Sequence, residues 1–125
     1  LLGFQNYSKF KLKHKHEEMI DMRARVTTVT AKPGAIDEFI KVYTEGTVPV
    51  AMKQDGFEGA LLLVDRESNK TIVISMWETE EKMKAGEASG YYQAQIQSRQ
   101  HLLEDDSNRE YFDIGARAWG ADIKS

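Results

Sequence analysis

Two β-branched segments carry the side chains best suited to bind a small molecule. One contains Arg25 and Thr27 at alternate positions, and the other contains Ser75 and Trp77 at alternate positions. Alternate residues of a strand point to the same face of a sheet, so each pair shares a face. Arg25 can stabilise an anion, and Trp77 can form an aromatic wall. The hydroxyls of Thr27 and Ser75 can donate hydrogen bonds, which completes a candidate binding site with no assigned catalytic residue.

Each of these side chains also has a purely structural interpretation. Trp77 is more typical of a packing residue in a protein interior or at a dimer interface, because large aromatic side chains dominate both. Arg25 can pair with a carboxylate such as Asp113 or Glu78 instead of a ligand. An arginine that points into a dry interior still needs some anion beside it.

Other residues with chemical potential lie outside the two strands. Tyr91 and Tyr92 occupy adjacent positions of a predicted helix, where one can be buried and the other exposed, and they are secondary candidates for substrate binding or proton transfer. His14 and His16 alternate as metal ligands on a strand do, but no carboxylate or cysteine ligands are arranged around them. With no Cys in the chain, we predict neither a metal site nor a bound cofactor.

The pattern of apolar and β-branched residues predicts the element order βαββαβ. Helices are expected to begin at Pro33 and at Thr79, the second in two pieces because Gly86 and Gly90 interrupt it. The predicted strands are 23–30, 57–64, 71–77 and 109–118. Such an order builds a ferredoxin-like α+β domain, a four-stranded antiparallel sheet with both helices on one face.

The other face of this sheet has no helices to cover it. We place Val29, Val73 and Trp77 on that open face, together with the binding candidates Arg25, Thr27 and Ser75. A bare apolar sheet predicts a homodimer, in which two sheets pack face to face as a dimeric α+β barrel. The space between the sheets is then the expected pocket for a small hydrophobic or aromatic ligand.

Composition narrows the class of protein. The chain has 125 residues, of which 41% are hydrophobic and 30% charged, as in one globular domain. We divide it into an N-terminal appendage (1–21), the domain (22–118) and a C-terminal tail (119–125). A net charge of -3 gives no reason to expect nucleic acid as a partner. No apolar run is long enough for a membrane span, so we expect a cytoplasmic protein.

Five short motifs, in this order and spacing, resemble the antibiotic biosynthesis monooxygenase family. They are Lys32-Pro33-Gly34, Gly56-Phe57, Trp77-Glu78-Thr79-Glu80, Ser89-Gly90-Tyr91-Tyr92 and Tyr111-Phe112-Asp113-Ile114-Gly115. The resemblance covers roughly Met22 to Arg117. It implies the dimeric α+β barrel and a family that includes cofactor-free oxygenases of aromatic polyketides and quinols as well as haem-degrading oxygenases.

The haem-degrading branch needs an asparagine, a tryptophan and a histidine where this chain has Thr27, Gly86 and Ile96. Since isoleucine cannot ligate iron, haem degradation is not expected. The cofactor-free branch has polar residues where this chain has Val73 and Met83. The resemblance therefore implies a cofactor-independent monooxygenase of an aromatic or quinol-type substrate, with a non-catalytic metabolite-binding or assembly protein of the same fold as the alternative.

Overall fold

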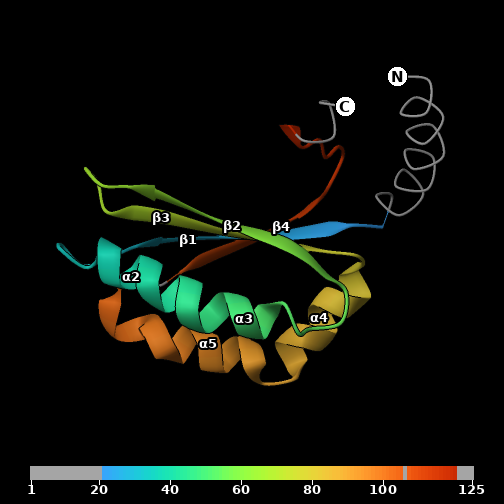
Figure 1. Cartoon of the computed structure of the whole chain (residues 1–125), viewed down its shortest axis with the longest axis horizontal. Helices are drawn as coiled ribbons and strands as arrows, with labels where there is room; N and C mark the ends of the chain where they lie inside the picture. The colour runs from blue at the N-terminus through green and yellow to red at the C-terminus, as the bar shows by residue number, and fades with distance from the viewer. Residues whose placement is uncertain (1–20, 106, 121–125) are drawn as a thin grey trace.

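The chain folds into one antiparallel sheet with its helices gathered on one face (Figure 1). The computed structural model describes residues 21–105 and 107–120, so most of the predicted N-terminal appendage lies outside the described residues. The strands are β1 (Arg23–Thr30), β2 (Phe57–Asp65), β3 (Lys70–Trp77) and β4 (Asn108–Asp113), in the spatial order β2-β3-β1-β4. The helical segments are α2 (Ile36–Val42), η1 (Tyr43–Thr47), α3 (Val48–Ala51), α4 (Glu80–Ala88), α5 (Tyr91–Arg99) and η2 (Gln100–Leu102).

Strand β1 lies at the centre of the sheet, between β3 and β4. Its β-branched sequence predicted a strand with these bounds, and the β2–β3 hairpin is also confirmed. In the register of β1 with β3, Arg25 lies opposite Ser75 and Thr27 lies opposite Val73. Strand β4 is shorter than the prediction of 109–118, because it ends at Asp113. The register therefore places the predicted binding residues side by side at the middle of the sheet.

The first helical region runs without a break from α2 through η1 to α3. It contains the π-helical turn η1, which includes Gly46. Pro49 follows directly, in the first turn of α3, where the helix returns from π to α geometry. Single π-helical turns occur often at functional sites, and this one carries Tyr43 and Thr47 toward the sheet.

The second helical region comes in two pieces, as predicted, but only one of the two glycines divides it. Thr79 caps α4, where its hydroxyl accepts a hydrogen bond from the Lys82 backbone N–H at 3.1 Å. The break falls at Gly90, whose φ of 92° is readily adopted only by glycine. Gly86 lies inside α4 instead, and a Cβ atom there would be 3.2 Å from Cη2 of Trp77. Gly86 is thus a point of close approach between α4 and the sheet.

One expectation about the sheet faces is wrong. Val29 packs with Phe39 and Leu102 in the core between the sheet and the helices, so the Val29 face is the covered one. Because the binding candidates share that face, Arg25 and its neighbours point toward the helices and not toward open solvent. Alternation along a strand sorts residues into two faces correctly, but both faces here carry apolar residues, so alternation alone could not tell which face the helices cover.

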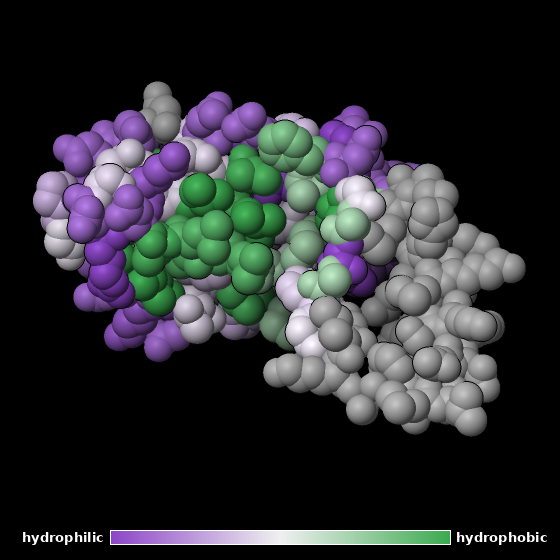
Figure 2. Space-filling model, turned by 90° about the horizontal axis from the view of Figure 1, so that it is seen from above, coloured by the Kyte–Doolittle hydropathy of each residue, from purple (hydrophilic) through white to green (hydrophobic). Residues whose placement is uncertain are grey.

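The uncovered face is made by the opposite set of residues. Leu61 and Leu63 of β2 are 45% and 46% exposed, and Phe112 of β4 is 48% exposed. Figure 2 views this face from above and shows hydrophobic side chains gathered over the sheet between polar ends. Ile72 and Ile74 lie opposite the two leucines in the β2–β3 register. None of the described helices is long and apolar enough to cross a membrane.

Candidate functional site

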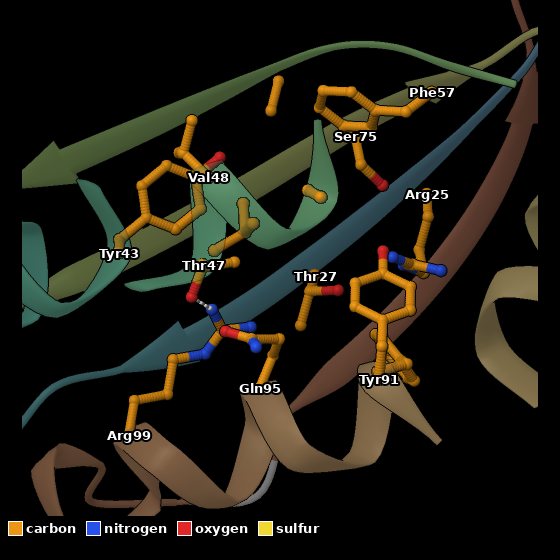
Figure 3. Close-up of a pocket in the computed structure, with 14 residues that line it drawn as sticks. Arg25, Thr27, Tyr43, Thr47, Val48, Phe57, Ser75, Tyr91, Gln95 and Arg99 are labelled. Carbon is orange, nitrogen blue, oxygen red and sulfur yellow. Dashed lines mark hydrogen bonds between the residues drawn. The ribbon is translucent and has the colours of Figure 1, made fainter. Parts of the chain in front are cut away.

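A cavity lies between the covered face of the sheet and the helices of the same chain (Figure 3). Its volume is about 40 Å³, enough for a few water molecules or a very small ligand. The sheet supplies Arg25, Thr27, Phe57, Ala60, Val73 and Ser75. The helical segments supply Tyr43, Thr47, Val48, Ala51, Tyr91, Tyr92, Gln95 and Arg99. Five of the six predicted binding residues therefore meet in one place, inside a single chain.

Arg25 is a buried cation at one end of the cavity, with only 6% of its surface exposed. Its guanidinium carbon lies 4.1 Å from the centre of the Tyr92 ring and 5.8 Å from that of Trp77. Its Nη1 lies 3.4 Å from Oε2 of Glu87, but it has no partner in hydrogen-bond geometry. Aromatic faces and one carboxylate thus hold the charge in place, while Nη1 keeps the capacity to donate to a ligand.

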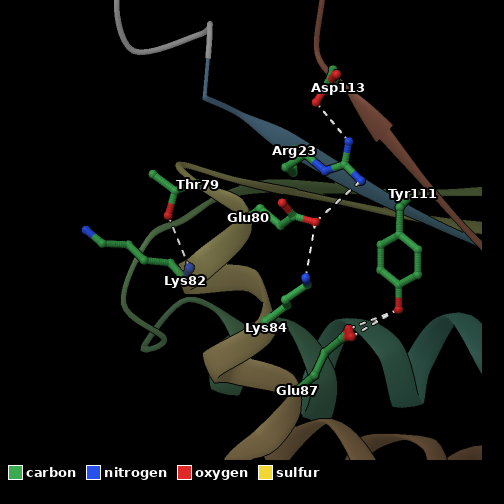
Figure 4. A network of polar contacts seen from close by, with 8 residues as sticks. All are labelled: Arg23, Thr79, Glu80, Lys82, Lys84, Glu87, Tyr111 and Asp113. Carbon is green, nitrogen blue, oxygen red and sulfur yellow. Dashed lines mark hydrogen bonds and ion pairs between the residues drawn. The ribbon is translucent and has the colours of Figure 1, made fainter.

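Glu87 of α4 anchors this end of the cavity (Figure 4). The Tyr111 hydroxyl donates to its carboxylate, with oxygen–oxygen distances of 3.0 and 3.1 Å, and Arg109 Nη1 lies 3.9 Å from its Oε1. The two carboxylates suggested by the sequence as partners of Arg25 have other partners: Asp113 pairs with Arg23 at 2.8 Å and Glu78 with Lys82 at 3.3 Å. Those two predictions are wrong, because Arg25 points inward and meets a helix instead of a strand end.

Trp77 is fully buried and is not among the residues that line the cavity. Its indole N–H donates to the Ser75 hydroxyl at 3.0 Å, and its ring packs edge-to-face on Phe57 with centroids 5.5 Å apart. The Gly86 backbone approaches the Cη2–Cζ3 edge of the ring. Trp77 therefore supports the wall formed by Ser75 and Phe57, which is the packing role weighed for it from the sequence.

The opposite end of the cavity contains residues that the sequence reasoning did not select. Arg99 is 7% exposed, and its Nη1 donates to the Thr47 hydroxyl at 3.3 Å. Tyr43 and Gln95 line the same end. A signal for Arg99 does exist in the sequence: it follows Tyr92 by seven residues, or two helical turns, and so lies on the same face of α5. Arginine is rarely buried, so Arg99 was expected at the surface and was not selected as a binding residue.

Tyr43 and Tyr91 of the cavity are neutral near pH 7. Burial raises the pKa of Tyr91 above its ordinary value, and the positive charge of Arg25 opposes this only in part. Burial likewise raises the pKa of Tyr43, against the opposing charge of Arg99. Both phenols can donate hydrogen bonds at neutral pH, but neither is suited to act as a base there.

These raised pKa values predict a loss of stability at alkaline pH. A tyrosine whose pKa is higher in the folded state than in the unfolded state stabilises the fold while it is neutral. This stabilisation is complete below the unfolded-state pKa of about 10, and it is lost as the pH rises through the folded-state pKa. The free energy of unfolding in urea should therefore fall above about pH 10. Tyr43→Phe should weaken the fall, and an equal fall in that variant would contradict the assignment.

A groove adjoins the cavity on the outside of the molecule. It is lined by Met52, Glu58 and Gly59 together with three residues that also line the cavity, Val48, Phe57 and Ala60, and its volume is about 340 Å³. The wall between the two spaces thus consists of a few small or rotatable side chains at the start of α3 and of β2.

Among the described residues no cluster of His, Cys, Asp and Glu could hold a metal ion, and His14 and His16 lie outside them.

Several solved structures share this fold. SnoaB, a cofactor-independent oxygenase from Streptomyces nogalater, superimposes with a TM-score of 0.66 and is 21% identical over 78% of this chain and 96% of its own. A conserved protein from Methanosarcina mazei Go1 gives a TM-score of 0.68 at 12% identity, covering 78% and 96%. Rv0793 from Mycobacterium tuberculosis gives 0.63 at 12% identity, covering 78% and 99%. At these identities the likeness establishes the fold alone.

Two curated relatives come from Mycobacterium tuberculosis (strain ATCC 25618 / H37Rv), and both carry the name "Uncharacterized protein". Rv2558 and Rv2557 are each 42% identical to this chain over 62 residues, or 50% of the chain. The match covers 26% of Rv2558 and 28% of Rv2557, so the chain spans about a quarter of the length of these relatives.

The family model described as antibiotic biosynthesis monooxygenase matches residues 22–98, which is more than half of the chain. The chain therefore belongs to the antibiotic biosynthesis monooxygenase family.

Proposed function

We propose that this chain pairs with a second copy through its open sheet face and binds an aromatic, quinol-type substrate in the cavity of each copy. There the protein acts as a cofactor-independent monooxygenase. The observation that carries the proposal is Arg25, a buried cation at the wall of an aromatic cavity whose Nη1 is near Glu87 but makes no hydrogen bond. Such a cation favours the ionised form of a phenol, and ionised phenols react directly with oxygen.

The chemistry requires no group beyond substrate and oxygen. The phenol loses its proton to water as it enters, and Arg25 stabilises the phenolate. The phenolate then transfers an electron to O₂, and the two radicals combine to form a carbon–oxygen bond. Loss of water from the resulting peroxide leaves a quinone, so that a phenol or hydroquinone with a free ortho or para C–H and one O₂ become one quinone and one water. A closed, largely apolar cavity supports this sequence by keeping bulk water away from the radical pair.

Substrate access is proposed to occur through the neighbouring groove. The cavity of about 40 Å³ is far smaller than the roughly 300–1,000 Å³ of pockets that bind drug-sized ligands. Rotation of Val48 and Phe57, which belong to both spaces, would join it to the groove of about 340 Å³. The π-helical turn directly before Val48 and the bulge in β2 between Phe57 and Gly59 place this wall at irregular points of the backbone.

Oxygen consumption tests the proposed activity. The purified chain, free of added metal and cofactor, is mixed with hydroquinones and polyphenols in an oxygen electrode. Consumption above the uncatalysed rate, with a quinone product that contains one oxygen atom from labelled O₂, is expected. Trp77→Phe should lower the rate, because it removes the hydrogen bond that orients Ser75. Arg66→Gln is a suitable control, since Arg66 pairs with Asp37 at the surface.

A non-catalytic binding protein of the same fold is the second candidate. It is favoured by the lining of the cavity, in which no residue is a histidine or a carboxylate that could act as a base. A substrate would have to ionise with the help of Arg25 alone or of Glu87 behind it. Thermal stabilisation by phenolic ligands without any oxygen consumption across the panel would establish this alternative and refute the oxygenase.

A further inference from the structure

The second buried arginine has no counter-ion. Arg99 ends α5, and within the described residues its guanidinium makes one hydrogen bond, to the neutral hydroxyl of Thr47. Its guanidinium carbon lies 5.7 Å from the centre of the Phe39 ring, a weak contact for a full charge. Among the described residues no carboxylate lies within ion-pairing distance of Arg99. Within that part of the chain its charge is therefore buried without a counter-ion.

The rest of the cavity does not compensate for this charge. Glu87, the carboxylate that pairs with Arg25, is also contacted by Arg109 and Tyr111. Burial lowers the pKa of Arg99 below its ordinary value, and the charge of Arg25 acts in the same direction. A guanidinium remains protonated even so, which means that the cavity carries an excess of positive charge.

The two arginines occupy different ends of the cavity (Figure 3). Arg25 and the Tyr91 hydroxyl lie at one end, and Arg99 and Thr47 lie at the other, where Gln95 also points. A ligand that spans the cavity thus meets a separate cation at each end. The phenolate of the proposed substrate accounts for only one of them.

We propose that Arg99 binds a carboxylate on the substrate, so that the substrate class is hydroxylated aromatic acids. This inference rests on the proposed function for the aromatic part of the ligand. A planar guanidinium matches the two oxygens of a carboxylate with parallel hydrogen bonds. The Thr47 hydroxyl accepts from Arg99, which leaves its own proton free to donate to the same carboxylate. The Gln95 amide can supply a further donor.

A matched pair of ligands tests the inference by binding alone. Dissociation constants for 2,5-dihydroxybenzoate and for its methyl ester are measured by calorimetry on the whole chain at pH 7.5 without oxygen. The acid should bind about tenfold more tightly than the ester or better, as expected for one charge-assisted pair. Arg99→Gln should remove this preference, Arg99→Lys should keep part of it, and Arg66→Gln should keep all of it.

Three results would overturn the inference: equal binding of acid and ester by the unaltered chain, a preference that survives in Arg99→Gln, or inorganic phosphate binding as tightly as the acid. If Arg99→Gln does not fold, the comparison of acid with ester and the Arg99→Lys variant still decide. Failure of the proposed activity can be distinguished from failure of the carboxylate site. If the chain still prefers the acid but consumes no oxygen, only the oxygenase activity is refuted. Oxidation of the ester as fast as the acid, with equal binding, refutes only the carboxylate site.

Discussion

Replacing Arg25 with glutamine should lower kcat for oxygen consumption about a hundredfold, the usual effect of removing a preorganised group that stabilises a developing anion. The guanidinium is buried against Tyr92 and Glu87, so its position is fixed before the substrate arrives. Glutamine keeps a hydrogen-bond donor but removes the charge that holds the phenolate. Because the interaction strengthens as the phenol ionises, kcat should fall more than KM rises.

The controls for this variant separate chemistry from folding. Arg25→Lys should retain part of the rate, since it keeps a cation but loses the planar stack on Tyr92. Glu87 keeps Arg109 and the Tyr111 hydroxyl as partners when Arg25 is changed, so the loss of one ion pair should leave the fold intact by circular dichroism. A folded Arg25→Gln protein with an unchanged kcat would show that this end of the cavity does no chemistry.

The double substitution Leu61→Asp and Leu63→Asp should convert the expected homodimer into monomers. Both leucines lie on the open face of β2 and are nearly half exposed in one chain. Two sheets packed on this face would bury four unpaired carboxylates per dimer, and the desolvation of such charges outweighs the apolar area that remains. Sedimentation velocity at micromolar concentration should show a dimer for the unaltered chain and a monomer for the variant.

A matched control exists on another surface. Met52 is the most exposed of the large apolar side chains in the described residues, at 68%, but it borders the groove and not the open face. Met52→Asp should therefore stay dimeric. A monomeric unaltered chain at micromolar concentration, or a dimer that survives both aspartates, would remove the reason for assigning the open face to a second copy.

Local patterns in the sequence predicted the elements well because the relevant forces are local. The β-branched residues of β1 and the helix-capping residue Thr79 determine backbone conformation within a few residues, and both predictions are confirmed. The role of Gly86 required tertiary information, since a glycine inside a helix looks the same whether it breaks the helix or admits a ring such as that of Trp77. The family and its fold are likewise confirmed, while the dimer and the activity stay predictions.

The site was predicted in its membership more accurately than in its location. Thr27 and Ser75 were grouped correctly because strand periodicity is strict, but the face was inverted because Val29 and Leu61 are equally apolar. Glu87 could not be identified as the partner of Arg25 from spacing, because the contact joins a helix to a strand far away in the sequence. The consequence is a candidate cavity enclosed within each chain instead of a pocket shared between two sheets.

A crystal structure of the chain with a bound hydroquinone-type ligand tests this location most directly. The ligand is expected in every copy between the sheet and the helices, with a phenolic oxygen within hydrogen-bond distance of Arg25. Val48 or Phe57 should be rotated to admit the ring. Density in the space between two packed sheets, with the cavity beside Arg25 still closed, would contradict this expectation.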